Sequence, residues 1–208
     1  MTAVWGPLGW MTLHSVATTY PEHPTAGERD LMTAWLDMFR DTITCPACQG
    51  HFSSMLASYR QSFPNMLSSR HNFAMFSFRA HNAVNRRLQK PVHGDLEACM
   101  GQLKNNVKNR SARDYRVSYL NHITRHWSVY RDITGIAALR KIAEMNKIEN
   151  EYISRRDTNF EVTLAADVVV LPQDVMDRTS PREAPSRPVI RAPPQGFRLT
   201  AGGIRIRR

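Results

Sequence analysis

The sequence predicts an all-α protein, and three observations support that fold class. Apolar residues recur at three- and four-residue spacings through most of residues 1–157, which is typical of amphipathic helices. Prolines interrupt the pattern at YPEHPT (20–25) and FPN (63–65), where helices should stop. The 208 residues are 42% hydrophobic, which favours a globular chain, and no apolar run approaches the ~20 residues of a membrane span.

Residues 1–95 predict a bundle of four short amphipathic helices. The third helix should begin near Cys45 with Pro46 in its first turn, where proline is tolerated. The fourth should end before KPVHGD (90–95). The four apolar faces are Trp10, Leu13, His14 and Ala17; Leu31, Trp35, Met38 and Phe39; Phe52, Met55, Leu56 and Tyr59; and Phe73, Phe76, Ala80, Val84 and Leu88.

Residues 96–171 predict a helical extension of unknown role, and residues 172–208 an extended basic tail. The extension has an apolar stripe formed by Ile136, Leu139, Ile142 and Ile148, and a short strand is possible within 161–172. The tail carries eight arginines against three acids, hence half of the net charge of +10, together with six prolines. Such a segment has too few core residues to fold alone and should become ordered only on a partner.

Cys45 and Cys48 form a Cys-x-x-Cys pair within CPACQGHF (45–52), and Cys99 is the one other cysteine. At a helix start, free backbone N–H groups and the helix dipole lower the pKa of a thiol. The short spacing lets one sulfur exchange with a substrate while the other resolves the mixed disulfide. This pattern favours a redox dithiol.

Three alternatives apply to the same pair. A structural zinc site needs four ligands, and the sequence offers only His51 as a third, so no metal is expected. A thioredoxin-like domain would place the pair after a buried strand, whereas LMTAWLDMFRDTIT (31–44) has helical spacing. The pair could also be a plain structural disulfide.

The stretch HNAVNRRLQKP (81–91) forms a second constellation. His81 and Asn85 are neighbours four residues apart on a helix, and Asn82 and Val84 lie close to them. This places a polar patch within an apolar stripe, and buried polar groups need partners. A polar ligand against this helix is one explanation, and ordinary surface decoration is the other.

These two stretches follow WGPLGWMTLHSVATTYP (5–21), and in this order and spacing the three resemble the Erv/ALR family of flavin-dependent sulfhydryl oxidases. The resemblance implies a four- or five-helix bundle that binds FAD beside the Cys-x-x-Cys pair. Its catalytic residues would be Cys45 and Cys48, with Cys48 next to the flavin. Its cofactor-binding residues would be Trp10, His14, His81, Asn82, Val84, Asn85 and Lys90, with Gly6 a looser match in the turn before the first helix.

The resemblance also implies the reaction and its partners. A thiol-containing substrate protein would attack Cys45, and its electrons would pass through Cys48 and FAD to oxygen, giving hydrogen peroxide. No separate shuttle pair is present, so Cys45 should meet substrates directly and the surface around Pro46 and Ala47 should be exposed. The family is commonly dimeric through its first helices, so we expect a homodimer, with Trp35, Met38 or the second apolar stripe at its interface.

The sequence departs from the family pattern at several points. Ile43 and Thr44 stand where an aromatic residue often precedes the pair. Cys99 lies near the first half of a structural disulfide but has no partner in the chain, so we expect a free buried thiol, or else an intermolecular disulfide. The family's phosphate clamp is not evident; the candidates to replace it are Arg110, Arg113 and Arg116, with Arg86 and Arg87 also near a pyrophosphate.

A family-like core followed by an unfamiliar helical region is similar to the oxidases of large DNA viruses. The N-terminus does not resemble a signal peptide, so we expect a location in the host cytoplasm or at viral assembly sites, with packaging in the virion as a possibility. The alternative function is a virion structural or interaction protein that uses the fold as a scaffold. Its basic tail, 172–208, would then contact capsid protein or nucleic acid.

Overall fold

The computed structural model describes residues 2–158, with side chains from Trp5 onward, and this part of the chain is helical without a strand. The first four helices are α1 (Thr2–Thr19), α2 (Ala26–Asp41), α3 (Pro46–Ser62) and α4 (Arg70–Arg87). They are followed by α5 (Leu96–Asn106), α6 (Ala112–Trp127), α7 (Ile133–Glu151) and the 3-10 helix η1 (Ile153–Arg155). The predicted all-α class is confirmed. The possible strand and the basic tail lie outside the described residues.

Side-chain caps fix where the helices begin. Each helix from α2 to α7 starts after a residue whose side chain accepts a hydrogen bond from a backbone N–H of the first turn, which satisfies one of the unpaired donors there. These caps are Thr25, Cys45, Ser69, Asp95, Ser111 and Asp132. The third helix therefore begins where the sequence predicts, with Pro46 in its first position.

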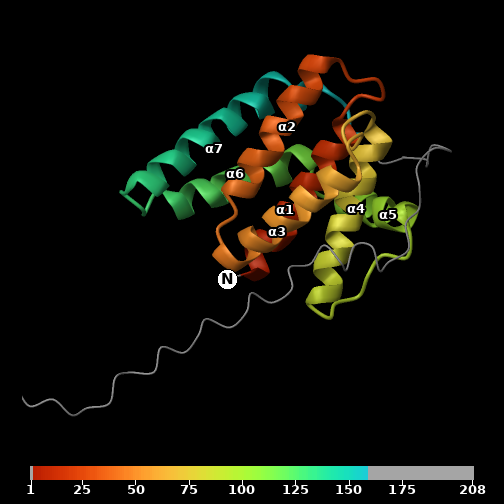
Figure 1. Cartoon of the computed structure of the whole chain (residues 1–208), viewed down its shortest axis with the longest axis horizontal. Helices are drawn as coiled ribbons and strands as arrows, with labels where there is room; N and C mark the ends of the chain where they lie inside the picture. Colours follow the sequence, from red (N-terminus) through yellow and green to blue (C-terminus); the bar gives the residue numbers. More distant parts are fainter. Residues whose placement is uncertain (1, 159–208) are drawn as a thin grey trace, which may run out of the picture.

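Helix α1 is the central element. All ten residues from Met11 to Tyr20 are buried, and the helix packs against both α4 and α6. Helix α7 packs in turn on α6 and α2, so α6 and α7 form an antiparallel pair along the first two helices (Figure 1). One hydrophobic core includes residues from α1 to α4 and from α6 and α7. The domain boundary predicted at residue 95 stays a prediction. The hydrophobic core contains residues from both sides of it.

Two expectations about apolar faces are wrong. Ile136 is 48% exposed, because the buried face of α7 follows Ala138, Ile142 and Met145, and Ile136 lies nearly half a turn away from Ala138. Trp35 is only 2% exposed within the single chain, since it packs in the core and stacks with Phe39. Trp35 is therefore not free for a dimer interface, and the homodimer itself stays a prediction.

A buried ion pair joins α6 to α7. The guanidinium of Arg116 donates from Nε to Glu149 Oε2 at 2.8 Å and from Nη2 to Oε1 at 3.0 Å. Its Nη1 also lies 3.4 Å from Ser15 Oγ on α1. Both charged side chains are almost fully buried. Arg116 thus serves the packing of three helices, and the idea that it clamps a phosphate is wrong.

We predict that Arg116→Ala lowers the free energy of unfolding by about 3–5 kcal/mol, because it leaves the Glu149 carboxylate buried without a partner. Urea unfolding followed by circular dichroism measures the loss. The matched control is Arg113→Ala on the exposed side of the same helix, which should change stability by no more than about 0.5 kcal/mol. Equal losses in the two variants would contradict this role.

Candidate active site at the Cys45–Cys48 disulfide

Cys45 and Cys48 are joined by a disulfide at the start of α3, with their Cα atoms 5.2 Å apart. Cys45 is also the N-cap of the helix, since its sulfur accepts the backbone N–H of Cys48 at 3.3 Å. Pro46 and Ala47, between the two cysteines, are exposed, as the sequence predicts. A thiolate formed at Cys45 would be stabilised by the positive end of the helix dipole.

Beside the disulfide lies a cavity of about 850 Å³, which is within the usual size of a small-molecule site. It is enclosed by α1, α3, α4, α5 and the end of α2. Residues 88–93, which follow α4 and which we call the strap, form one of its walls. Cys48 lines the cavity and Cys45 does not. Both cysteines are half-buried, and only Cys48 faces the cavity.

Most of the predicted site residues come together at this cavity. Those that line it are Gly6, Trp10, Cys48, His81, Val84, Asn85 and Lys90. His14 and Asn82 are buried beside it without lining it. The expectation that Gly6 lies in a turn before the first helix is wrong, because α1 already begins at Thr2.

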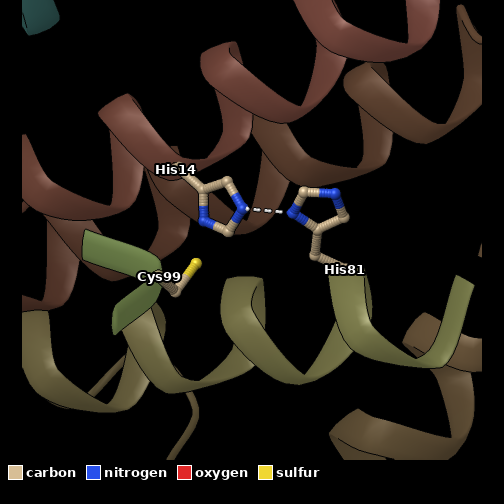
Figure 2. A group of neighbouring side chains, drawn as sticks. All are labelled: His14, His81 and Cys99. Atoms are coloured by element: carbon tan, nitrogen blue, oxygen red, sulfur yellow. Dashed lines mark hydrogen bonds between the residues drawn. The ribbon is translucent and has the colours of Figure 1, made fainter. Parts of the chain in front are cut away.

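An array of rings and hydrogen bonds joins α1 to α4 (Figure 2). The indole of Trp10 stacks on the imidazole of His81, with centroids 4.3 Å apart and planes 13° apart. His14 Nε2 lies 3.0 Å from His81 Nδ1, and His14 Nδ1 lies 2.9 Å from Ser77 Oγ. Because the Ser77 hydroxyl donates to the carbonyl of Ala74, it accepts from His14 Nδ1–H. His14 Nε2 is then the acceptor and His81 Nδ1–H the donor.

Burial keeps both imidazoles neutral. The pKa of His14 is lowered by desolvation first and by the nearby His81 and His93 next. The pKa of His81 is lowered to about 3, again chiefly by desolvation, with further contributions from His93 and Lys90. Neutral rings suit the stacking and the directed hydrogen bonds of this array.

Cys99 completes a group of three possible metal ligands with His14 and His81, whose donor atoms lie within 4.8 Å of one another (Figure 2). Both ring nitrogens of His14 are already occupied by hydrogen bonds, so a metal would have to break the contact with His81. Cys99 is free and buried, as predicted, and desolvation raises the pKa of its thiol to about 12. The three side chains thus pack together as neutral groups. It includes neither Cys45 nor His51, which the zinc alternative requires.

The two asparagines of the HNAVN stretch hold the strap in place. Asn82 donates to the carbonyl of His93 at 2.9 Å and accepts its backbone N–H at 3.0 Å. Asn85 donates to the carbonyl of Pro91 at 3.0 Å. Gln89 adopts a φ of 54°, and the chain then turns so that the N–H of Lys90 bonds the carbonyl of Asn85. Asn82 and Asn85 therefore position the cavity wall through its backbone.

Two cavity residues have buried polar atoms without a partner. Trp5 Nε1 and His51 Nδ1 are enclosed and make no hydrogen bond. Unpaired buried donors and acceptors are costly, so a ligand with polar groups would satisfy them. Sequence reasoning did not assign either to the cavity, although Trp5 stands in one of the quoted stretches and His51 was weighed only as a zinc ligand. Only the tertiary structure, which places the two side chains at the cavity, identifies them.

Other cavity residues were not predicted because they come from the end of the strap, after residue 91, and from α5, which carry no motif. They include Val92, His93, Gln102, Leu103 and Asn106. Among the basic residues weighed for phosphate, Arg87 and Lys90 line the cavity. Arg110 does not line it; its guanidinium contacts the ring of Tyr115 and the hydroxyl of Ser118. None of the helices in residues 2–158 has the length and apolarity to cross a membrane.

The sequence model of the Erv1/Alr family matches residues 8–114, just over half of the chain. This stretch contains the disulfide and nearly all of the cavity lining. No solved structure matches the chain.

The curated relatives share this stretch. The chain is 38% identical over 88 residues to a protein of Invertebrate iridescent virus 3 described as a candidate FAD-linked sulfhydryl oxidase, a match over 42% of this chain and 58% of that relative. It is 32% identical to the FAD-linked sulfhydryl oxidase of an African swine fever virus isolate, over 42% of this chain and 71% of the relative. It is 34% identical to the mitochondrial FAD-linked sulfhydryl oxidase of Saccharomyces cerevisiae, over 41% and 43% respectively.

We predict that the flavin-free chain loses stability as the pH falls from 6.5 toward 3. In this window the unfolded chain binds protons at His14 and His81 that the folded chain does not, so acid favours unfolding. Between pH 7 and pH 5 the wild type should lose roughly 2 kcal/mol more than His81→Gln. Urea midpoints at the two pH values give this difference. The exposed His23→Gln is the matched control and should keep the wild-type loss.

Proposed function

Because the chain belongs to the Erv1/Alr family, we propose that it is an FAD-dependent thiol oxidase that makes disulfide bonds in substrate proteins. The observation that carries this proposal is the placement of one disulfide between two environments. Cys45 is half-buried beside the exposed Pro46 and Ala47, and Cys48 lines a cavity large enough for a cofactor. Electrons that enter at Cys45 would thus reach Cys48 at the cavity. The chain spans 58% of the length of its iridescent virus relative, so substrates and partners are part of the proposal.

The residues around the cavity fit FAD in size and in chemistry. Trp10 and His81 present aromatic rings against which a planar ring system packs. Arg87 and Lys90 supply cations for a pyrophosphate. The unpaired nitrogens of Trp5 and His51 supply polar contacts that a cofactor would complete. This combination supports a flavin dinucleotide more directly than an apolar ligand.

The cysteines perform the exchange at the surface. A substrate thiolate attacks Cys45, a mixed disulfide forms, and the Cys45–Cys48 bond breaks, with Cys48 leaving as a thiolate on the cavity side. A second substrate thiolate then attacks the mixed disulfide, so the substrate leaves oxidised and Cys45 leaves as a thiolate. The chemistry that bound FAD would supply is acceptance of two electrons and their transfer to oxygen, which yields hydrogen peroxide. Trp10, His81 and the strap would orient that group and limit the access of water.

The remaining expectations about context stay predictions. The viral relatives favour a role in infected cells, in the host cytoplasm or at an assembly site. The homodimer and packaging in the virion still need experiments. The alternative function, a structural virion protein, depends on residues 172–208, which lie outside the described part of the chain. No observation therefore favours it over the oxidase.

We predict that Cys48→Ser abolishes reduction of bound FAD by dithiothreitol while FAD remains bound. The variant keeps the cavity but removes the sulfur that lines it. Oxidised flavin absorbs at roughly 450 nm, so the loss of this absorbance after anaerobic addition of dithiothreitol reports reduction of the bound FAD. Cys99→Ser is the matched control, because it removes the one cysteine outside the disulfide, and it should be reduced as the wild type is. Normal dithiol oxidation by Cys48→Ser would make the assignment wrong.

We also predict that Trp10→Ala weakens FAD binding by about 10- to 100-fold, the usual cost of removing one stacked aromatic ring. Titration of the flavin-free chain with FAD, followed by quenching of flavin fluorescence, measures the dissociation constant. Trp35→Phe is the control, since Trp35 is a core residue that does not line the cavity and this conservative change should leave the affinity unchanged. Equal affinities for Trp10→Ala and wild type would argue against the cavity as the FAD site.

A further inference from the structure

The turn between α6 and α7 exposes a cluster of large apolar side chains. Val129 is 72% exposed, Tyr130 45%, Ile133 87% and Ile136 48%. We call these four residues the hairpin patch. Single exposed apolar residues are ordinary, but four within eight residues indicate a binding surface. The turn lies beyond residue 114, where the family match ends.

Contacts link the hairpin patch to the segment that precedes the disulfide. Trp127 Nε1 donates to the carbonyl of Thr42 at 3.0 Å, and Thr42 precedes Cys45 by three residues, which span at most about 10 Å. The ring of Tyr130 lies 5.5 Å from the ring of Trp127. Lys141 and Asp41 form a second link, with 2.6 Å between Nζ and Oδ2. The turn and the connection from α2 to α3 lie on the same side of the bundle (Figure 1).

The turn is built to hold its shape. The N–H of Tyr130 bonds the carbonyl of Trp127, and Asp132 caps α7 by accepting the N–H of Gly135 at 2.8 Å. A Cβ on Gly135 would lie only 2.1 Å from the carbonyl oxygen of Tyr130, so a glycine is required there. The patch is therefore presented on a fixed backbone. Fixed presentation lowers the entropy lost when a partner binds.

Positively charged side chains lie at one edge of the patch. Ile133, Ile136 and Arg140 lie on the same face of α7, at positions i, i+3 and i+7, and all three are exposed. Arg131, in the turn itself, is also exposed. The surface thus suits an apolar segment that carries acidic side chains at its edge.

We propose that the hairpin patch binds an extended apolar segment of a partly folded thiol protein and so presents the neighbouring cysteine to Cys45. This proposal rests on the proposed function, since it names the substrate class of that disulfide. Cysteine is among the most buried residue types in folded proteins, so apolar side chains flank many cysteines before a disulfide forms. Those side chains are accessible only while the substrate is still incompletely folded. The contacts that link the patch, through Trp127 and Thr42, to the segment before Cys45 favour such a substrate over other occupants.

The first test compares a protein substrate with a small dithiol. Ile133→Ser combined with Ile136→Ser should lower kcat/KM for reduced, unfolded ribonuclease about tenfold and leave turnover of dithiothreitol unchanged, because dithiothreitol is too small to bridge the patch and Cys45. Val117→Ser is the matched control: Val117 is exposed on α6, ten residues before Trp127, and its loss should affect neither substrate. Unchanged kcat/KM for ribonuclease, or an equal loss with dithiothreitol, would overturn the proposal.

The second test does not depend on flavin chemistry. In a Cys48→Ser background, the Cys45 thiolate attacks a peptide cysteine activated as its mixed disulfide with thionitrobenzoate, forms a Cys45–peptide disulfide and releases thionitrobenzoate, which is coloured. A peptide with apolar residues beside the cysteine should react about tenfold faster than a glycine- and serine-flanked peptide, and the serine double substitution should remove the difference. Equal rates for the two peptides would overturn the proposal even if the oxidase is confirmed. Failure to oxidise any dithiol would reject the oxidase alone.

The same variants test the other occupants. Light scattering of the purified full chain gives its mass with and without Ile133→Ser and Ile136→Ser. An unchanged mass supports the proposal. A change from dimer to monomer on substitution would overturn it, because the patch would then be a contact between two copies of the chain.

Discussion

The enclosure of α1 is the constraint on which the rest of the structure depends. Because each residue from Met11 to Tyr20 is buried, the polar side chains of this stretch can bond only to groups inside the protein, and all but the Thr12 hydroxyl do so. The hydroxyls of Thr18 and Thr19 bond carbonyls of the helix itself. His14 bonds outward to α4, and Ser15 meets Arg116 of α6. The same buried helix thus fixes the ring array at the cavity on one side and the position of α6 on the other.

At the site, Cys45 has both a structural and a chemical role. Its sulfur caps α3, so the residue that defines where the helix begins is also the one placed to meet a thiol. Cys48 follows three residues later and lines the cavity, whereas Cys45 does not. The electron transfer that we propose, from Cys45 to Cys48, therefore takes place within the first turn of α3.

How far the sequence predicts this arrangement depends on the range of the interactions. The four bundle helices and the helix start at Pro46 follow from local spacing and breakers, the free buried thiol at Cys99 follows from the departure from the family pattern, and all are confirmed. The phase of α7 was misjudged at Ile136, because its buried face is set by contact with α2 and α6 and not by its own isoleucines. Glu149, the partner of Arg116, lies 33 residues away in the sequence, so no local pattern predicts the ion pair. Asn82 shows the same limit: no local pattern predicts that its amide bonds the backbone of His93 and holds the strap, while its contact with a ligand stays a prediction.

The antiparallel pair α6–α7 combines a buried ion pair with an exposed apolar turn. Its inner face carries a desolvated ion pair, Arg116 with Glu149, whose exchange for apolar residues would often be neutral or stabilising. The value of such a pair is the single register it imposes, since a slide of one turn would leave both charges unpaired. Register matters here because the outer end of the pair meets the segment before Cys45 through one hydrogen bond, from Trp127 to Thr42. A shift of the pair would move the apolar turn relative to the disulfide, so the buried charges position an exposed surface.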